Sequence, residues 1–176
     1  MTSFYRDRLT TPIGTIVLAT DERVLRALEF EDHAERIAAW MARRGERPAF
    51  VDRPDPLGVT SRLAAYFAGR IDAIDDIPTA GGGTPFQEGV WAALRRIPAG
   101  RTTSYGALAA QLGKPTAMRA VGAANGANPI SVVVPCHRVI GADGTLTGYG
   151  GGIERKRWLL AHEGAVSPPA GRGGRA

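Results

Sequence analysis

The chain has 176 residues, 44% of them hydrophobic and 22% charged, a composition typical of a globular protein with one large or two small domains. No apolar stretch approaches the roughly 20 residues of a membrane span, and the N-terminus lacks a signal-peptide core, so we expect a cytoplasmic protein with no membrane partner. The single cysteine excludes an internal disulfide, and with only three histidines available we expect no metal site. The formal net charge of +5 divides into −2 over residues 1–80 and +7 over residues 81–176. This asymmetry favours a polyanionic partner for the second half, although a solvated basic surface also explains it.

The first part of the chain shows strand and helix patterns but no cluster of catalytic residue types. Residues 13–20 and 24–30 are short β-type runs separated by a polar turn and predict two strands. Segment 44–58 is rich in proline and charge and predicts a loop. Helical spacing predicts two helices, with apolar faces formed by Ala34, Ile37, Ala38 and Met41 and by Val59, Leu63, Tyr66 and Phe67. We therefore expect this part to be structural.

Segment 78–85, PTAGGGTP, is the predicted domain boundary, because three consecutive glycines leave the backbone unconstrained. We expect a structural domain over residues 1–80 and a second domain over residues 81–165. The remaining residues, 166–176, are rich in glycine, proline and arginine and predict a disordered tail.

A strong helix start follows the glycines. Thr84 fits an N-cap, Pro85 suits the first helical position, and Gln87 stands where a capping box requires it. The apolar face of the next residues predicts a helix over 86–97.

Two further short helices come next. Ser104 fits the cap of a helix that stops at Gly113, and Pro115 fits the start of another that ends near Asn128. Two short helices joined by a tight turn are typical of a helix-turn-helix, and a plain helical hairpin in a core gives the same pattern. The positive charge of this half favours DNA binding.

Cys136 lies in the segment VVVPCHRVI, residues 132–140. The valines predict an interior strand that Pro135 ends, and the thiol is then either a small buried hydrophobe or a reactive group. His137 and Arg138 are potential cations beside it, a setting in which the pKa of a thiol is lowered. Because neighbours in a strand face opposite sides, His137 is expected to reach Cys136 through a water or across a sharp turn.

His137 also needs an acceptor that fixes its tautomer. Glu163, at the end of the last predicted helix, is the first candidate, and Asp143 is the rival. Asp143 and Gly144 predict a hairpin turn, and the glycine-rich stretch 148–152 predicts the rim of a site.

The segment PCHRVIG, with ANGANPI before it and TGYGGG after it, resembles the O6-alkylguanine-DNA alkyltransferases, also called methylated-DNA–protein-cysteine methyltransferases. The resemblance covers residues 83–164, and the first 80 residues fit that family's ribonuclease-H-like domain only loosely. It implies an α/β fold in which this N-terminal domain precedes a winged helix-turn-helix domain. That domain binds double-stranded DNA carrying O6-alkylguanine in the minor groove and flips the damaged nucleotide into a pocket.

The resemblance also assigns roles to individual residues. Cys136 is implied as the alkyl acceptor, His137 as a base acting through water, and Glu163 as its orienting group. Tyr105 would donate to guanine N3, Arg119 would fill the vacated stack with Ala117 beside it, and Asn128 would brace the turn before the active-site segment. The implied pocket residues are Val139, Tyr149, Gly150 and Ser131. Some family members carry serine and proline in place of Gly150 and Ser131, so the smaller rim here predicts room for bulkier adducts or for O4-alkylthymine.

The implied reaction is a single alkyl transfer per chain, without a cofactor, by a monomer whose cooperative assembly on DNA is left open. Two other functions remain as alternatives. A thiol hydrolase uses the same Cys–His–acid chemistry but gives no reason for a helix-turn-helix. A non-catalytic sensor of alkyl lesions binds DNA, but such sensors in this family lack the cysteine that this chain retains.

Overall fold

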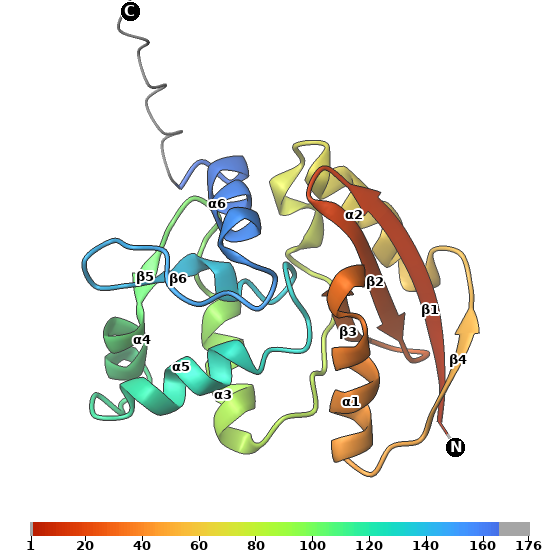
Figure 1. Ribbon diagram of the computed structural model, residues 1–176, viewed down its shortest axis with the longest axis horizontal. Helices are drawn as coiled ribbons and strands as arrows, with labels where there is room; N and C mark the ends of the chain where they lie inside the picture. Colours follow the sequence, from red (N-terminus) through yellow and green to blue (C-terminus); the bar gives the residue numbers. More distant parts are fainter. Residues whose placement is uncertain (1, 166–176) are drawn as a thin grey trace, which may run out of the picture.

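The computed structural model describes residues 2–165, in which a sheet-containing half is followed by a mainly helical half (Figure 1). The first half forms one four-stranded sheet of order β3-β2-β1-β4. Its elements are β1 (Thr2–Thr11), β2 (Gly14–Thr20), β3 (Leu25–Phe30), α1 (Glu35–Arg43), β4 (Pro48–Asp52) and α2 (Val59–Phe67). The second half contains α3 (Pro85–Arg95), β5 (Thr103–Ser104), α4 (Tyr105–Gln111), α5 (Met118–Gly126), β6 (Val139–Ile140) and α6 (Ile153–His162). The predicted tail lies outside the described residues.

The sheet is covered on both faces because its strands alternate. In β2, Val17 contributes to a core cluster with Ile37 of α1, whereas Ile16 and Leu18 contribute to a second cluster with Leu63 of α2. Since successive side chains of a strand point to opposite faces, the two helices lie on opposite sides of the sheet. The two strands and two helices that the first half predicts are confirmed.

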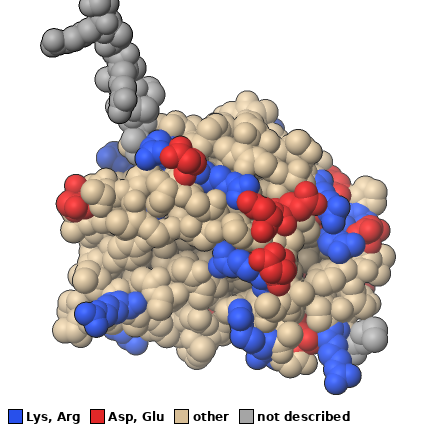
Figure 2. Space-filling view, viewed as in Figure 1, with Lys and Arg blue, Asp and Glu red and all other residues tan. Residues whose placement is uncertain are grey.

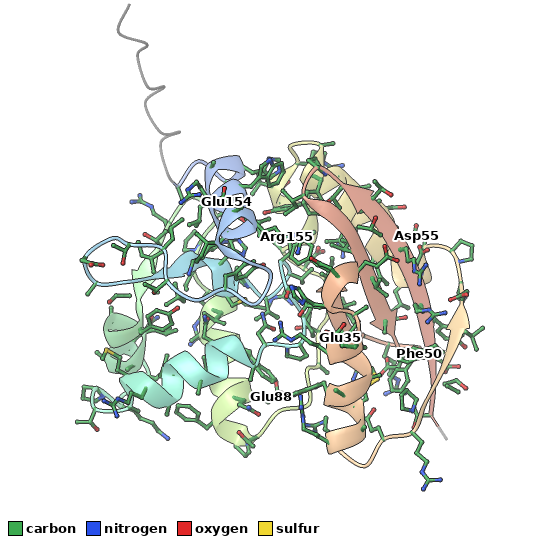
Figure 3. All side chains as sticks on the ribbon, viewed as in Figure 1. Glu35, Phe50, Asp55, Glu88, Glu154 and Arg155 are labelled. Carbon is green, nitrogen blue, oxygen red and sulfur yellow. The ribbon has the colours of Figure 1, made fainter. Side chains whose placement is uncertain are left out.

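The loop predicted over residues 44–58 is wrong in part, because it contains strand β4. This strand pairs in parallel with β1 at the edge of the sheet, and Phe50, labelled in Figure 3, packs its ring 6.2 Å from that of Phe4. Pro48 is the first residue of the strand, a position at which a missing N–H donor is tolerated. The run of five residues is too short for a strand pattern to stand out in the sequence.

Helix α3 begins as predicted, since Thr84 and Gln87 form both hydrogen bonds of a capping box. The glycines before it are not unconstrained, however. A Cβ on Gly81 or Gly83 would stand within 2.7 Å of the Trp91 ring, and Trp40 Nε1 donates to the Gly81 carbonyl over 3.0 Å. The segment between the halves is therefore packed against indole rings from both of them, Trp40 from α1 and Trp91 from α3.

Helices α4 and α5 follow in the order that the sequence predicts. The side chain of Ser104 caps α4 by accepting from the Ala107 N–H over 3.1 Å. Helix α5 begins at Met118, three residues later than predicted, because residues 115–116 form a turn in which the Ala117 N–H donates to the Lys114 carbonyl. Strand β6 pairs in parallel with β5, and the Asp143–Gly144 turn follows β6 without a flanking strand pair.

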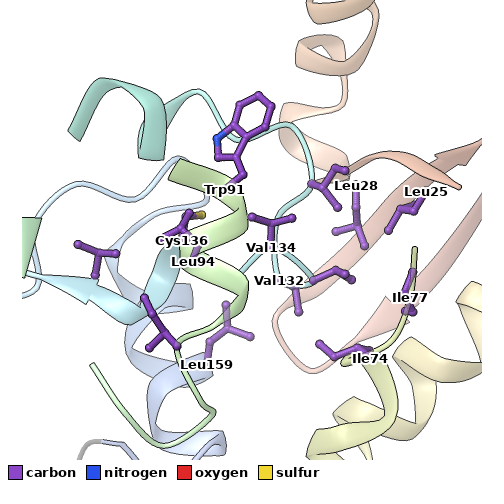
Figure 4. Packing of buried hydrophobic residues seen from close by; sticks show 14 of the residues in the cluster. Leu25, Leu28, Ile74, Ile77, Trp91, Leu94, Val132, Val134, Cys136 and Leu159 are labelled. Atoms are coloured by element: carbon purple, nitrogen blue, oxygen red, sulfur yellow. The ribbon is translucent and has the colours of Figure 1, made fainter. Parts of the chain in front are cut away.

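The larger of the two core clusters is shared by both halves. Leu28 and Ile74 of the first half pack in one cluster with Leu94, Val134 and Leu159 of the second (Figure 4). Main-chain bonds add to this contact, since the N–H of Leu28 donates to the Pro129 carbonyl. The common core holds the elements of the second half in a fixed relation to the sheet.

Helix α6 adds a polar clamp across the same boundary. Arg155, labelled in Figure 3, donates to the Ile13 carbonyl, pairs with Asp32 at 2.9 Å and lies 4.1 Å from the centre of the Phe30 ring. Among residues 2–165, no helix has the length and apolar character that crossing a membrane requires.

Candidate active site between the two halves

The valine run before Cys136 is not the strand that the sequence predicts. Val132 has a φ of +70°, and the Val133 N–H donates to the Ser131 carbonyl over 2.8 Å, so the chain turns sharply there. A second tight turn joins the Cys136 N–H to the Val134 carbonyl over 2.8 Å. A β-branched residue rarely adopts a positive φ, which explains why three valines misled the prediction. Their prediction as core residues is confirmed, because all three are buried.

Asn128 holds these turns together from inside. Its side-chain amide donates to the Val134 carbonyl over 2.8 Å, and its Oδ1 accepts from the Ile130 N–H over 2.9 Å. Asn128 is buried, so water does not compete for these bonds. The side chain thus connects the end of α5 to the segment that delivers the thiol.

Cys136 begins a short 3-10 helix (Cys136–Arg138), and 6% of its surface is exposed. Burial raises the pKa of the thiol, which is the reverse of the lowered pKa that its sequence neighbours predict. Asn128 and the Lys156 ammonium oppose the rise but do not overcome it. The thiol is therefore protonated at neutral pH and needs a base before it can act as a nucleophile.

His137 is fully buried beside the thiol. Its Nε2 lies 2.9 Å from Glu163 Oε1, whereas its Nδ1 is buried with no partner among the described residues. Burial lowers the pKa of His137, so the imidazole is neutral and the carboxylate keeps the ring proton on Nε2. The free lone pair on Nδ1 can accept a proton. The rival acceptor, Asp143, is instead bonded to Thr145 in an exposed turn.

The carboxylate of Glu163 accepts four hydrogen bonds. They come from His137 Nε2, from Arg138 Nε and Nη2 at 2.9 Å each, and from the Tyr66 hydroxyl at 2.7 Å. Burial alone would raise the pKa of Glu163, but the hydrogen bonds and charges of His137 and Arg138 hold it far below its usual range. The carboxylate is therefore ionised and fixed in orientation.

Two residues that bond to Glu163, Arg138 and Tyr66, were not predicted from the sequence as its partners. Arg138 was predicted only as a potential cation beside the thiol, with no partner assigned, whereas it is buried, bonds to Glu163 and also donates to the Ile97 carbonyl over 2.6 Å. Tyr66 belongs to α2, so the first half is not only structural but also contributes to the site. A signal for Arg138 was its position next to Cys136 and His137, whereas nothing in the sequence links Tyr66 to a carboxylate 97 residues away.

Lys156 is a further buried cation that the sequence did not single out. Its ammonium donates to the carbonyls of Val139 and Thr147, at 2.6 and 2.9 Å. Burial lowers the pKa of Lys156, while the nearby Cys136 opposes the shift. The side chain ties the loop after β6 to the active-site segment and places a positive charge near the thiol.

An open cavity of about 470 Å³ lies beside this cluster. Four of the site residues that the sequence predicts line it: Tyr105, Arg119, Tyr149 and Gly150. Cys136 adjoins the cavity through the lining residue Asn125, whose side-chain amide donates to the Cys136 carbonyl over 3.4 Å. Ala117, Val139 and Ser131 do not line it. A cavity of this size, lined by both apolar and polar groups, can accommodate a small planar ligand.

Three of the lining residues carry polar side-chain groups in different settings. The Tyr105 hydroxyl donates to the Thr147 carbonyl over a long 3.3 Å, and burial raises the pKa of this phenol. The Tyr149 hydroxyl is buried without a partner among residues 2–165. The side chain of Arg119 is exposed and makes no hydrogen bond or ion pair with other residues in the range 2–165.

The first half reaches the rim of this cavity as well. Arg36 pairs with the buried Glu29 at 3.0 Å, and its Nη1 lies 2.4 Å from the point that a Cβ on Gly150 would occupy. The space that a larger residue would fill at Gly150 is therefore taken by a guanidinium. Ser131 is buried behind the rim, where its hydroxyl donates to Glu29 over 3.4 Å.

The charge asymmetry of the sequence is only partly a surface property. Arg138 and Lys156 are buried, and Arg155 pairs with Asp32. On the face that Figure 2 shows, acidic and basic side chains intermingle over the sheet half and few charged side chains lie over the helical half. In the described range, no three His, Cys, Asp or Glu side chains gather as metal ligands would.

Two family models match the chain: "6-O-methylguanine DNA methyltransferase, ribonuclease-like domain" over residues 4–80 and "6-O-methylguanine DNA methyltransferase, DNA binding domain" over residues 85–165. The chain belongs to the methylated-DNA–protein-cysteine methyltransferase family. The relative from Salmonella typhimurium is 53% identical over 167 residues, which are 93% of this chain and 98% of the relative. The relative from Mycolicibacterium paratuberculosis is 47% identical over 159 residues, which are 90% and 91% of the two chains.

Solved structures of the family have the same fold. The Mycobacterium tuberculosis OGT in complex with DNA aligns with a TM-score of 0.76 and 42% identity over 96% of both chains. The methyltransferase from the archaeon Pyrococcus kodakaraensis aligns with a TM-score of 0.74 and 26% identity over 92% of this chain and 99% of its own. The expected fold class, a ribonuclease-like α/β domain followed by a helical DNA-binding domain, is confirmed, as is the enzyme class of a DNA repair methyltransferase.

Proposed function

We propose that this protein repairs double-stranded DNA by moving the alkyl group of O6-alkylguanine onto its own Cys136, once per molecule. The observation that carries the proposal is the buried line from Glu163 through His137 toward Cys136, next to a cavity lined by Tyr105, Arg119 and Tyr149. A base in the duplex cannot reach a buried thiol, so the nucleotide must be flipped into this cavity.

The transfer is a single displacement at carbon. Cys136 Sγ forms a bond to the alkyl carbon while the bond between that carbon and guanine O6 breaks, and the electron pair stays with the base. The thiol proton passes through a water to His137 Nδ1, and Glu163 stabilises the imidazolium that forms. A raised thiol pKa restrains the nucleophile until this proton transfer takes place.

Two cavity residues act on the base and on the duplex. Tyr105 exchanges its long bond to the Thr147 carbonyl for one to guanine N3, where negative charge develops as the base leaves. Arg119, exposed at the cavity edge, enters the stack that the flipped nucleotide vacates. The cavity that Gly150 lines admits a small alkyl group, but the Arg36 guanidinium fills the space in which the glycine was expected to leave room for bulkier adducts.

Duplex DNA carrying a radiolabelled O6-methylguanine, given in excess, tests the proposal. We expect one equivalent of methyl on the protein and none beyond it, because a thioether is stable and no group of the site is placed to hydrolyse it. The variant Cys136→Ser should bind the duplex and accept no methyl. Release of more than one equivalent would show a turning-over hydrolase, and binding by the wild type without transfer would show a lesion sensor.

A further inference from the structure

We propose that Tyr66, in the first half of the chain, is a positioning residue for the transfer, because its hydroxyl sets how strongly Glu163 holds His137. This inference rests on the proposed function, in which His137 accepts the thiol proton. It makes the sheet half part of the proton relay and not only a support for it.

The contact is direct and shielded. The Tyr66 hydroxyl donates to Glu163 Oε1 over 2.7 Å, and the same oxygen accepts from His137 Nε2 and Arg138 Nη2. Tyr66 and His137 are both 0% exposed, so no solvent replaces the bond. Three donors therefore share the charge of one oxygen.

Packing fixes the direction of the hydroxyl. The Tyr66 ring lies edge-on to Phe67, with ring centres 5.1 Å apart, and edge-on to His162, with centres 5.2 Å apart. The backbone carbonyl of Tyr66 also accepts from His162 Nε2 over 2.7 Å. Removal of the hydroxyl alone leaves this packing in place, so its effect on the relay can be separated from its effect on the fold.

The sign of the effect follows from charge sharing. A carboxylate oxygen that accepts from Tyr66 and Arg138 has less negative charge to offer the imidazolium of His137. Without the Tyr66 hydroxyl, Glu163 stabilises that imidazolium more strongly, so His137 is protonated at higher pH. Arg138 and Lys156, the cations that face His137, act in the opposite direction and are unchanged by the substitution. The pKa of Tyr66 is raised far above 10 by burial and by Glu163, so the phenol remains a donor throughout.

The experiment measures the single-turnover rate of methyl transfer from duplex DNA against pH. For Tyr66→Phe, the acid limb of the profile should lie at higher pH than in the wild type. At the midpoint of the wild-type limb the variant should react about threefold to tenfold more slowly, the factor expected for one hydrogen bond. The rate on the alkaline plateau should change less than twofold. Tyr5→Phe, on β1 and away from the site, is the matched control and should leave the profile unchanged.

A second variant tests the opposite sign. Site-specific 3-fluorotyrosine at position 66 keeps the ring and makes the hydroxyl a stronger donor, so the acid limb should move to lower pH. If the acid limb of the pH profile does not move in either variant while Cys136 is still methylated once, the inference is overturned and the proposed function stands. A wild type that accepts no methyl would overturn both. Reduced thermal stability without a moved limb would show that Tyr66 only packs.

Discussion

In the proton relay from Glu163 through His137 to Cys136, the two oxygens of Glu163 accept four hydrogen bonds. At the other end of the relay, three polar atoms are buried without a partner in the part of the chain described, namely His137 Nδ1, Asn125 Oδ1 and the Tyr149 hydroxyl. A buried polar atom without a partner costs about 1 to 3 kcal/mol, so a folded protein rarely carries three of them close together. The orienting end is thus complete before substrate arrives, and the reacting end is left for the ligand and water to satisfy.

Glu163→Gln should cause the largest change in stability and activity, because it removes the carboxylate that accepts these four hydrogen bonds. The substitution keeps the size of the side chain but leaves Arg138, whose side chain is 6% exposed, as a buried cation without a counter-charge. We expect a loss of about 3 to 5 kcal/mol in the free energy of unfolding, measured by urea denaturation, together with loss of methyl transfer.

The control for this substitution is Glu154→Gln on the same helix, whose carboxylate is 87% exposed and pairs only with Arg157. It should cost less than about 0.5 kcal/mol. Acid titration adds a second check. Because the pKa of Glu163 lies below the value of 4.5 for a free carboxyl, its stabilising contribution is present above pH 4.5 and is lost as the pH falls further. The Glu163→Gln protein should lose stability less steeply over this range, and an equal slope would contradict the assignment.

Arg119→Ala changes the reacting end of the site, and its effect on stability should be smaller than that of Glu163→Gln. The side chain of Arg119 makes no hydrogen bond or ion pair with the other residues in 2–165, so the free energy of unfolding should change by less than about 0.5 kcal/mol. Transfer from duplex DNA should slow about tenfold, because extrusion of a stacked base costs a few kcal/mol, whereas reaction with the free O6-alkylguanine base should be almost unaffected. Arg23→Ala, an exposed charge in the sheet half, is the matched control. Equal slowing with duplex and free base would show that Arg119 does not act on flipping.

Local patterns predicted the orienting elements of this protein better than its turns. The capping box at Thr84 and the apolar face of α2 depend on neighbours within one or two turns of helix, and they are confirmed. The predicted face of α1 is confirmed at Ile37 and Met41 but is wrong at Ala38, which is exposed. The valine run failed because the positive φ of Val132 is imposed by bonds from Asn128 and from the opposite half, not by the valines.

The candidate site was predicted from a local motif and completed only by tertiary contacts. Cys136 and His137 are neighbours in sequence, and Glu163 could be predicted because it lies at the end of the last predicted helix. The roles of Tyr66 and Lys156 could not be predicted, since a buried hydrogen bond across the fold produces no pattern in the sequence. The pKa of Cys136 was predicted in the wrong direction because burial, which the motif does not reveal, outweighs the nearby cations.

The tautomer of His137 tests the difference between the two ends most directly. A long-range ¹H–¹⁵N spectrum of protein labelled at its three histidines, recorded at neutral pH, distinguishes the protonated ring nitrogen of each. The account predicts a neutral His137 with its proton on Nε2, bonded to Glu163, and an unprotonated Nδ1. A proton on Nδ1, or an imidazolium at rest, would contradict it, because His137 could then not accept the proton of Cys136.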